Sequence, residues 1–115
     1  MPPPSQLAIA TGAVTRLLRE EASYHKELAD QEAQVKKLEE SIQNGGGDDD
    51  GNAEFMLKQN KTAVEQTKAV FGPLKDRIAA AVTKLEDQIA LAEEAGGSEH
   101  LESAKSVLAQ AKSKA

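Results

Sequence analysis

Residues 7–42, with the sequence LAIATGAVTRLLREEASYHKELADQEAQVKKLEESI, decide the fold of this chain. Apolar residues recur there every seven positions, with a second series three places later, and only Glu21 and Gln31 interrupt the pattern. The two series are Leu7, Val14, Leu28, Val35 and Ile42, and Ala10, Leu17, Tyr24 and Leu38. This spacing forms one apolar stripe along a helix and is typical of helices that pack lengthwise on a partner.

A second run, residues 57–92, repeats the same heptad spacing. Its apolar members are Leu57, Val64, Phe71, Leu74, Ile78, Ala81, Leu85 and Ala92, and its polar members are Asn60, Thr67 and Gln88. The period predicts a second long helix with a stripe of its own.

An acidic, glycine-rich break at residues 44–52 separates the two runs. Glycine supplies the positive φ that a helix C-terminal cap needs, and the aspartates precede a second helix whose macrodipole favours negative charge. At the other end of the first run, Ser5 follows three prolines and can cap the first helix. Because the connection is short, we expect the two helices to be antiparallel.

A shorter third helix follows the glycine pair Gly96–Gly97, with its apolar residues on one face. These residues are Leu101, Ala104, Val107, Leu108 and Ala111. Within the second helix, Pro73 removes one hydrogen bond and predicts a bend. We therefore expect an all-α fold, an elongated antiparallel three-helix bundle that forms a single helical domain over residues 1–115. Its parts are a helix over about 6–43, the acidic Gly/Asp loop 44–52, a helix over about 53–94 bent at Pro73, and a helix over about 99–113.

The amino-acid composition argues against some classes of binding partner and of chemistry. The chain has 115 residues, with 14 Lys and Arg and 19 Asp and Glu. No stretch of the sequence contains a cluster of five or six Lys and Arg residues. We therefore expect neither nucleic acid nor a membrane as partner. Cysteine is absent, so disulfides and thiolate chemistry are excluded. The N-terminal stretch does not resemble a signal peptide, and no long apolar run is present, so we expect a soluble, cytoplasmic protein.

No arrangement of residues indicates catalysis, a metal or a cofactor. His25 lies four residues after Glu21, but a single such pair is more often a solvated contact than a ligand set. The serines lack a nucleophile motif. The glycines at 45–47 are followed by three aspartates, which would repel a phosphate. We expect no enzyme activity, no catalytic residues, no metal ligands and no bound cofactor.

Two features of the helices have both a structural and a functional interpretation. Polar residues within the apolar stripes either control the register or meet a partner. Gly12 is the second feature: the heptad count places it on the outer face of the first helix, where alanine would be better by about 1 kcal/mol. Either it is a neutral defect, or another backbone approaches it closely.

The charged residues of the first helix are also open to two interpretations. Arg16, Arg19, Glu20, Lys26 and Glu27 lie outside the apolar stripe. They are either solvated charges with no individual role or a recognition surface.

One segment resembles a known family. The residues TGAVTRLLRE at 11–20, YHKE at 24–27 and QE at 31–32 are similar to the N-terminal helix of the tubulin-binding cofactor A (tubulin-specific chaperone A) family. The resemblance extends to the acidic break, to Pro73 and to the helix core AKSVL at 104–108. The long Gly/Asp loop, the proline-rich start and the alanine-rich second helix depart from the family pattern.

The resemblance implies a non-enzymatic tubulin-folding cofactor. Such a protein captures and holds quasi-native β-tubulin before αβ-tubulin heterodimer assembly, needs no nucleotide for holding, and is cytoplasmic and cytoskeleton-associated. It also admits other tubulin-folding cofactors as partners. The candidate β-tubulin contacts that carry over from the motif are Thr11, Gly12, Arg16, Arg19, Glu20, Lys26 and Glu27. Val14, Leu17 and Tyr24 occupy stripe positions and are expected to support the helix. The alternative is a homodimeric coiled-coil scaffold or adaptor protein.

Overall fold

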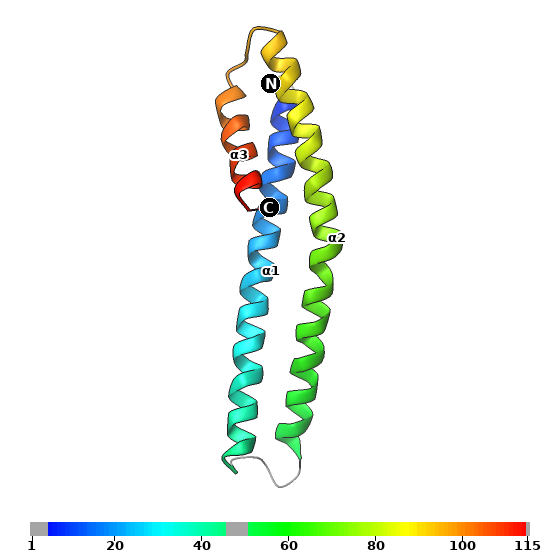
Figure 1. Ribbon diagram of the computed structural model, residues 1–115, viewed down its shortest axis with the longest axis vertical. Coiled ribbons are helices and arrows are strands. Elements are labelled where there is room, and N and C mark those ends of the chain that lie inside the picture. Colours follow the sequence, from blue (N-terminus) through cyan, green and yellow to red (C-terminus); the bar gives the residue numbers. More distant parts are fainter. Residues whose placement is uncertain (1–4, 46–50, 115) are drawn as a thin grey trace. The chain divides into compact units, whose positions relative to one another are not determined.

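The described part of the protein is entirely helical apart from turns. The computed structural model describes residues 5–45 and 51–114, and within them it contains no strand (Figure 1). The helices are α1 (Gln6–Gln43), α2 (Asn52–Glu94) and α3 (Leu101–Ser113). The prediction of an all-α helical bundle is confirmed. The three prolines before Ser5 and loop residues 46–50 lie outside the described residues.

The chain is organised as two compact units. One comprises the chain up to Glu21 together with the part from Pro73 onward, and the other is Ala22–Gly72. We call them the three-helix unit and the two-helix unit. On α2 the boundary falls between Gly72 and Pro73, and α2 continues through the proline without interruption. The bend expected at Pro73 lies at this boundary and stays a prediction.

The helix ends follow from local hydrogen bonding. The backbone N–H of Ala8 donates to Ser5 Oγ (3.1 Å), so Ser5 caps α1. At the end of α2, Gly96 donates to the carbonyl of Glu93 (3.1 Å) and Gly97 to that of Ala92 (2.8 Å). Both glycines have positive φ, and this pair of bonds is the Schellman motif that ends many helices.

The third helix begins two residues later than the sequence suggests. The N–H of His100 donates to Ser98 Oγ (3.3 Å), and that of Leu101 donates to the Ser98 carbonyl (3.2 Å). Glu99 and His100 therefore lie in a turn, and α3 starts at Leu101. Ser98 organises this turn and does not cap the helix.

The three-helix unit contains the main hydrophobic core. Leu7 and Val14 of α1, Leu85 of α2, and Ala104 and Ala111 of α3 are all buried in one cluster. Leu101, Val107 and Leu108 pack against it, so the whole predicted apolar face of α3 meets the other two helices. The alanines permit this close packing because they have no side chain beyond Cβ.

Two buried residues lie outside the predicted stripes. Leu18 and Ile89 are buried, whereas their neighbours Leu17 and Gln88, which the heptad count favoured, are only half-buried. A heptad count for two helices assumes a single partner and finds a single stripe. In this unit each long helix also faces α3, and the second contact buries one further residue on each helix, Leu18 on α1 and Ile89 on α2.

The two-helix unit has a thinner interior. In this unit, no described residue of α1 is fully buried. The half-buried residues of α1 are Tyr24, Leu28, Gln31, Val35, Leu38 and Ile42. These six are the predicted stripe. Phe71 of α2 packs edge-on against Tyr24, with ring centroids 6.4 Å apart, while Lys61 pairs with Glu39 at 3.7 Å. Residue numbers therefore rise on one helix as they fall on the other, which confirms antiparallel packing.

Gln31 is a polar member of this stripe and has an unsatisfied atom. Its Oε1 atom is buried and accepts no hydrogen bond within the described residues. Its Nε2 atom makes only a long hydrogen bond of 3.5 Å to Glu27 Oε1. A buried acceptor without a donor costs roughly 1–3 kcal/mol, so Gln31 lowers the stability of this seam.

We predict that Leu85→Ala destabilises the protein by about 2–5 kcal/mol, because Leu85 is 0% exposed and its loss leaves a cavity. Urea unfolding followed by circular dichroism measures the change. Leu91→Ala is the matched control: Leu91 lies on the same helix, is 56% exposed, and should change stability by less than about 0.5 kcal/mol. Equal effects of the two substitutions would contradict the assigned core.

We also predict that Gln31→Leu stabilises the protein by about 1 kcal/mol, because it removes the unpaired acceptor and adds apolar surface to the seam. The midpoint of urea unfolding should rise. Gln34→Leu, an exposed position on the same helix, should not raise it. If Gln34→Leu raised the unfolding midpoint as much as Gln31→Leu, the unpaired acceptor of Gln31 would not be what lowers the stability.

Candidate functional site

The candidate cations on α1 in the three-helix unit are free to contact a partner. Arg16 and Arg19 are exposed, three residues apart on the same helix, and neither forms an ion pair within residues 5–45 and 51–114. Glu20 is half-buried and lies 3.6 Å from the Arg77 guanidinium of α2. Glu20 therefore has a partner inside the protein, whereas the two arginines present unpaired donors to solvent.

Thr11 and Gly12 differ from the charged candidates because both are half-buried. The Thr11 hydroxyl donates to the Leu7 carbonyl one turn earlier (2.7 Å), so it is occupied within the helix. Around Gly12, a Cβ atom would meet no heavy atom within 4 Å. No close approach inside the described chain therefore requires glycine at this position.

Lys26 and Glu27 belong to the two-helix unit and are both exposed. Within the part of the chain that the structure describes, Lys26 has no ion-pair partner, and Glu27 receives only the long hydrogen bond from Gln31. Next to them, the His25 ring stacks on Phe71 with centroids 4.5 Å apart and planes inclined by 26°. The half-buried Tyr24 also contacts Phe71, which places it in the seam, where the sequence predicted it would support the helix.

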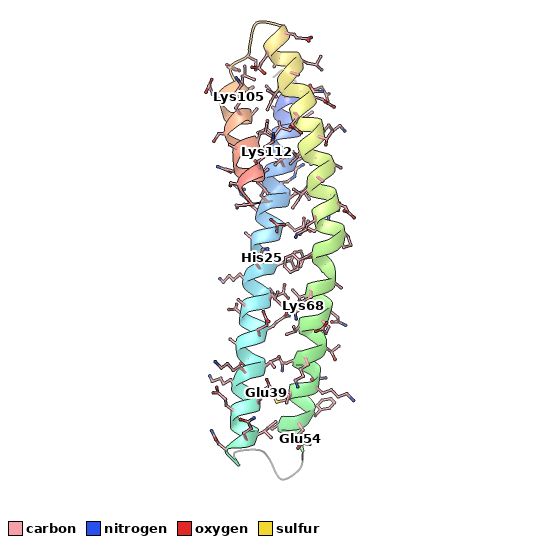
Figure 2. All side chains as sticks on the ribbon, viewed as in Figure 1. His25, Glu39, Glu54, Lys68, Lys105 and Lys112 are labelled. Carbon is pink, nitrogen blue, oxygen red and sulfur yellow. The ribbon has the colours of Figure 1, made fainter. Side chains whose placement is uncertain are left out.

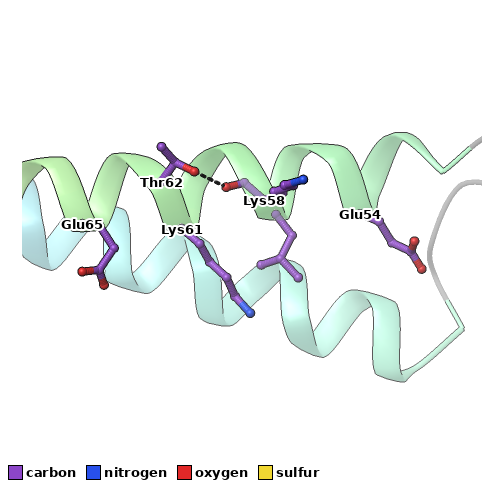
Figure 3. A pocket seen from close by; sticks show the side chains of 6 residues that line it. Glu54, Lys58, Lys61, Thr62 and Glu65 are labelled. Atoms are coloured by element: carbon purple, nitrogen blue, oxygen red, sulfur yellow. Dashed lines mark hydrogen bonds between the residues drawn. The ribbon is translucent and has the colours of Figure 1, made fainter.

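The structure also shows exposed apolar side chains that the sequence reasoning did not single out. Phe55 is 58% exposed and Met56 is 39% exposed, near the start of α2. Their heptad positions would have revealed them, because both fall outside the stripe that begins at Leu57. A shallow hollow beside them is lined by α2 alone, between Glu54 and Glu65 (Figure 3).

That hollow has ordinary surface chemistry. The Thr62 hydroxyl donates to the Lys58 carbonyl (3.1 Å), as Figure 3 shows, and Lys58, Lys61 and Glu65 surround it. No nucleophile there is paired with a base. Within residues 5–45 and 51–114, no three His, Asp or Glu side chains are grouped so that they could hold a metal ion. Nor is any helix of those residues long and apolar enough to span a bilayer.

Comparison with known proteins connects this geometry to a family. Tubulin binding cofactor A is the family that matches, over residues 2–108. The Saccharomyces cerevisiae protein named Tubulin-specific chaperone A is 36% identical over 75 residues, which cover 65% of this chain and 63% of the yeast protein. The aligned part thus spans less than two thirds of that relative. No solved structure gave a significant match. Because the family match covers nearly the whole sequence, this chain belongs to the tubulin binding cofactor A family.

Proposed function

We propose that this protein is a non-enzymatic tubulin-folding cofactor that captures and holds quasi-native β-tubulin before αβ-tubulin heterodimer assembly. The observation that carries the proposal is the family match over residues 2–108. The name of the yeast relative, Tubulin-specific chaperone A, supports the same role. The proposed setting is the cytoplasm, in association with the cytoskeleton, and other tubulin-folding cofactors are proposed as further partners.

A protein that holds a folded or nearly folded subunit needs a binding surface, and it does not need to form or break a covalent bond. The helices are ordered by their own hydrogen bonds and by the seams, so binding costs little conformational entropy on this side of the interface. Exposed, unpaired cations also speed encounter with a partner that presents carboxylates and fix its orientation. The proposed β-tubulin contacts therefore centre on Arg16, Arg19 and Lys26.

The other four candidate residues are proposed to contribute less to binding than the three cations. Glu27 is exposed and can pair with a cation of the client. Glu20 would have to share its carboxylate with Arg77. Thr11 and Gly12 are half-buried, so they would contribute close backbone approach and not charge.

One observation favours the alternative, a homodimeric coiled-coil scaffold or adaptor. In the two-helix unit, the α1 stripe residues are only half-buried, and Phe55 is exposed. A second copy could cover such surface and complete a bundle. The scaffold predicts dimers of the purified protein, whereas the cofactor predicts a defined complex with β-tubulin. Light scattering of the protein alone and with β-tubulin separates the two.

We predict that reversing two of the free cations, by the double substitution Arg16→Glu and Lys26→Glu, weakens β-tubulin binding by about tenfold or more. Co-elution of the purified proteins and a titration of labelled β-tubulin measure the loss. The helical circular dichroism spectrum should be retained, because both side chains are exposed and unpaired.

The matched control is the double substitution Lys37→Glu and Lys84→Glu, which makes the same change of net charge at exposed, unpaired positions, again with one in each unit. It should bind nearly as well as the parent. Undiminished binding by the Arg16/Lys26 variant would remove these residues from the site. Equal losses in both variants would indicate a response to net charge alone.

A further inference from the structure

A groove in the three-helix unit lies where α3 ends. It has a volume of about 470 Å³, and the residues that line it all belong to this unit. Its apolar lining comes from α1, α2 and α3, through Leu18, Ile78, Val82 and Ala111. The other lining residues are Glu21, Lys75, Ala79, Thr83, Lys112 and Lys114. A lining that combines apolar and charged side chains is typical of grooves that bind an amphipathic helix.

The groove continues the surface on which α3 packs. Leu18 belongs to the buried core cluster that holds Ala104 and Ala111 of α3, and Ile78 and Val82 pack against the same cluster. α3 covers this surface only as far as its last turn, at Ser113. The surface beyond that turn is thus of the kind that already accepts one amphipathic helix in this protein, so a helix is the occupant whose shape fits.

The charges beside the groove are opposite to those beside α3. Along α3, lysines of the short helix meet acids of α2: Lys105 lies 3.1 Å from Glu93, and Lys112 lies 3.1 Å from Glu86. Both lysines are labelled on α3 in Figure 2. The groove instead is lined by Lys75, Lys112 and Lys114 and by one acid, Glu21; Lys112 is held by Glu86, so Lys75 and Lys114 are the lysines that can meet an incoming group. Lys75 and Lys114 form no ion pair within the described residues.

The lysines that line the groove determine which kind of helix can bind there. An incoming helix must present carboxylates to Lys75 and Lys114, as α2 presents them to α3. A second copy of α3 fits poorly, because its own lysines at 105, 112 and 114 would meet the lysines of the groove. Like charges brought together at an interface cost free energy and suppress the wrong partner.

We propose that this groove binds an amphipathic α-helix of a partner protein, with an apolar face at i, i+3, i+4 and i+7 spacing and with Asp or Glu beside that face. The proposal goes beyond the tubulin-folding role and does not depend on it. It also gives the half-buried Glu21 a functional interpretation. As the one acid among the lining residues, it would accept a hydrogen bond from a polar or basic group at one point on an otherwise acidic helix.

The test uses two synthetic fluorescent peptides and the full chain. Both peptides carry leucines at the stated helical spacing; one has glutamates beside them and the other has lysines. Fluorescence anisotropy should show saturable binding of the acidic peptide and at least about tenfold weaker binding of the basic one. The net charge of the protein is −5, so non-specific attraction would give the opposite preference.

Two adjacent substitutions separate the groove from the general surface. Ala79→Trp places a large, uncharged side chain in the groove and should weaken binding of the acidic peptide by about tenfold or more. Ala80→Trp adds the same side chain at an exposed neighbouring residue that does not line the groove, and it should leave the affinity nearly unchanged. Both alanines are exposed, so both variants should keep the parent's helicity and unfolding midpoint.

A charge reversal gives a second, independent readout. Lys75→Glu should shift the preference toward the lysine peptide, because it changes the sign at an exposed position without enlarging the side chain. The proposal is overturned if neither peptide binds the parent, or if the basic peptide binds as tightly as the acidic one. It is also overturned if Ala79→Trp and Ala80→Trp act alike, or if Ala79→Trp instead abolishes self-association, which would assign the groove to a second copy.

Discussion

Two helices packed side by side can cover only one stripe of each other, and this limit leaves α1 without a buried side chain in the two-helix unit, although Val64 and Thr67 of α2 are buried there. Within the described residues of α1, every buried side chain lies between Leu7 and Leu18, in the unit that contains α3. In the two-helix unit the α1 stripe remains half-buried. The third helix converts a seam into a core, and Ala104, which is fully buried, allows its backbone to come close.

Ion pairs between helices set the electrostatics of the three-helix unit. Glu86 and Glu93 of α2 are paired with lysines of α3, and Glu20 is paired with Arg77. Each of these three acids thus has a basic partner, whereas Arg16, Arg19 and Lys75 have no ion-pair partner in the described chain. The mildly acidic net charge therefore coexists with local cationic surface on the faces proposed to bind partners.

Much of the fold was predictable because a heptad repeat is a local pattern with a direct geometric meaning. The half-buried residues of α1 in the two-helix unit are the predicted stripe, with Gln31 included, and the five residues predicted for the apolar face of α3 belong to the core or pack against it, as expected. The predicted stripes did not include the buried residues Leu18 and Ile89, because α3 gives each long helix a second contact surface. It also placed the start of α3 two residues early, because Ser98 closes a turn and does not cap the helix. For the candidate site, the family-like motif predicted the contact residues, but no local pattern distinguishes Arg16, which is unpaired in the described chain, from Glu20, which pairs with Arg77.

The amino-acid sequence by itself determined the helical class, the apolar face of each helix and the family, since all three depend on residue spacing along one chain. Only the tertiary structure decided which charges are paired, which part of α1 packs against α3, and where the end of α3 lines a groove together with α1 and α2. These properties depend on how far one helix is displaced along another. That displacement is fixed by packing between residues distant in sequence, such as Leu7, Leu85 and Ala104, and no local pattern encodes it.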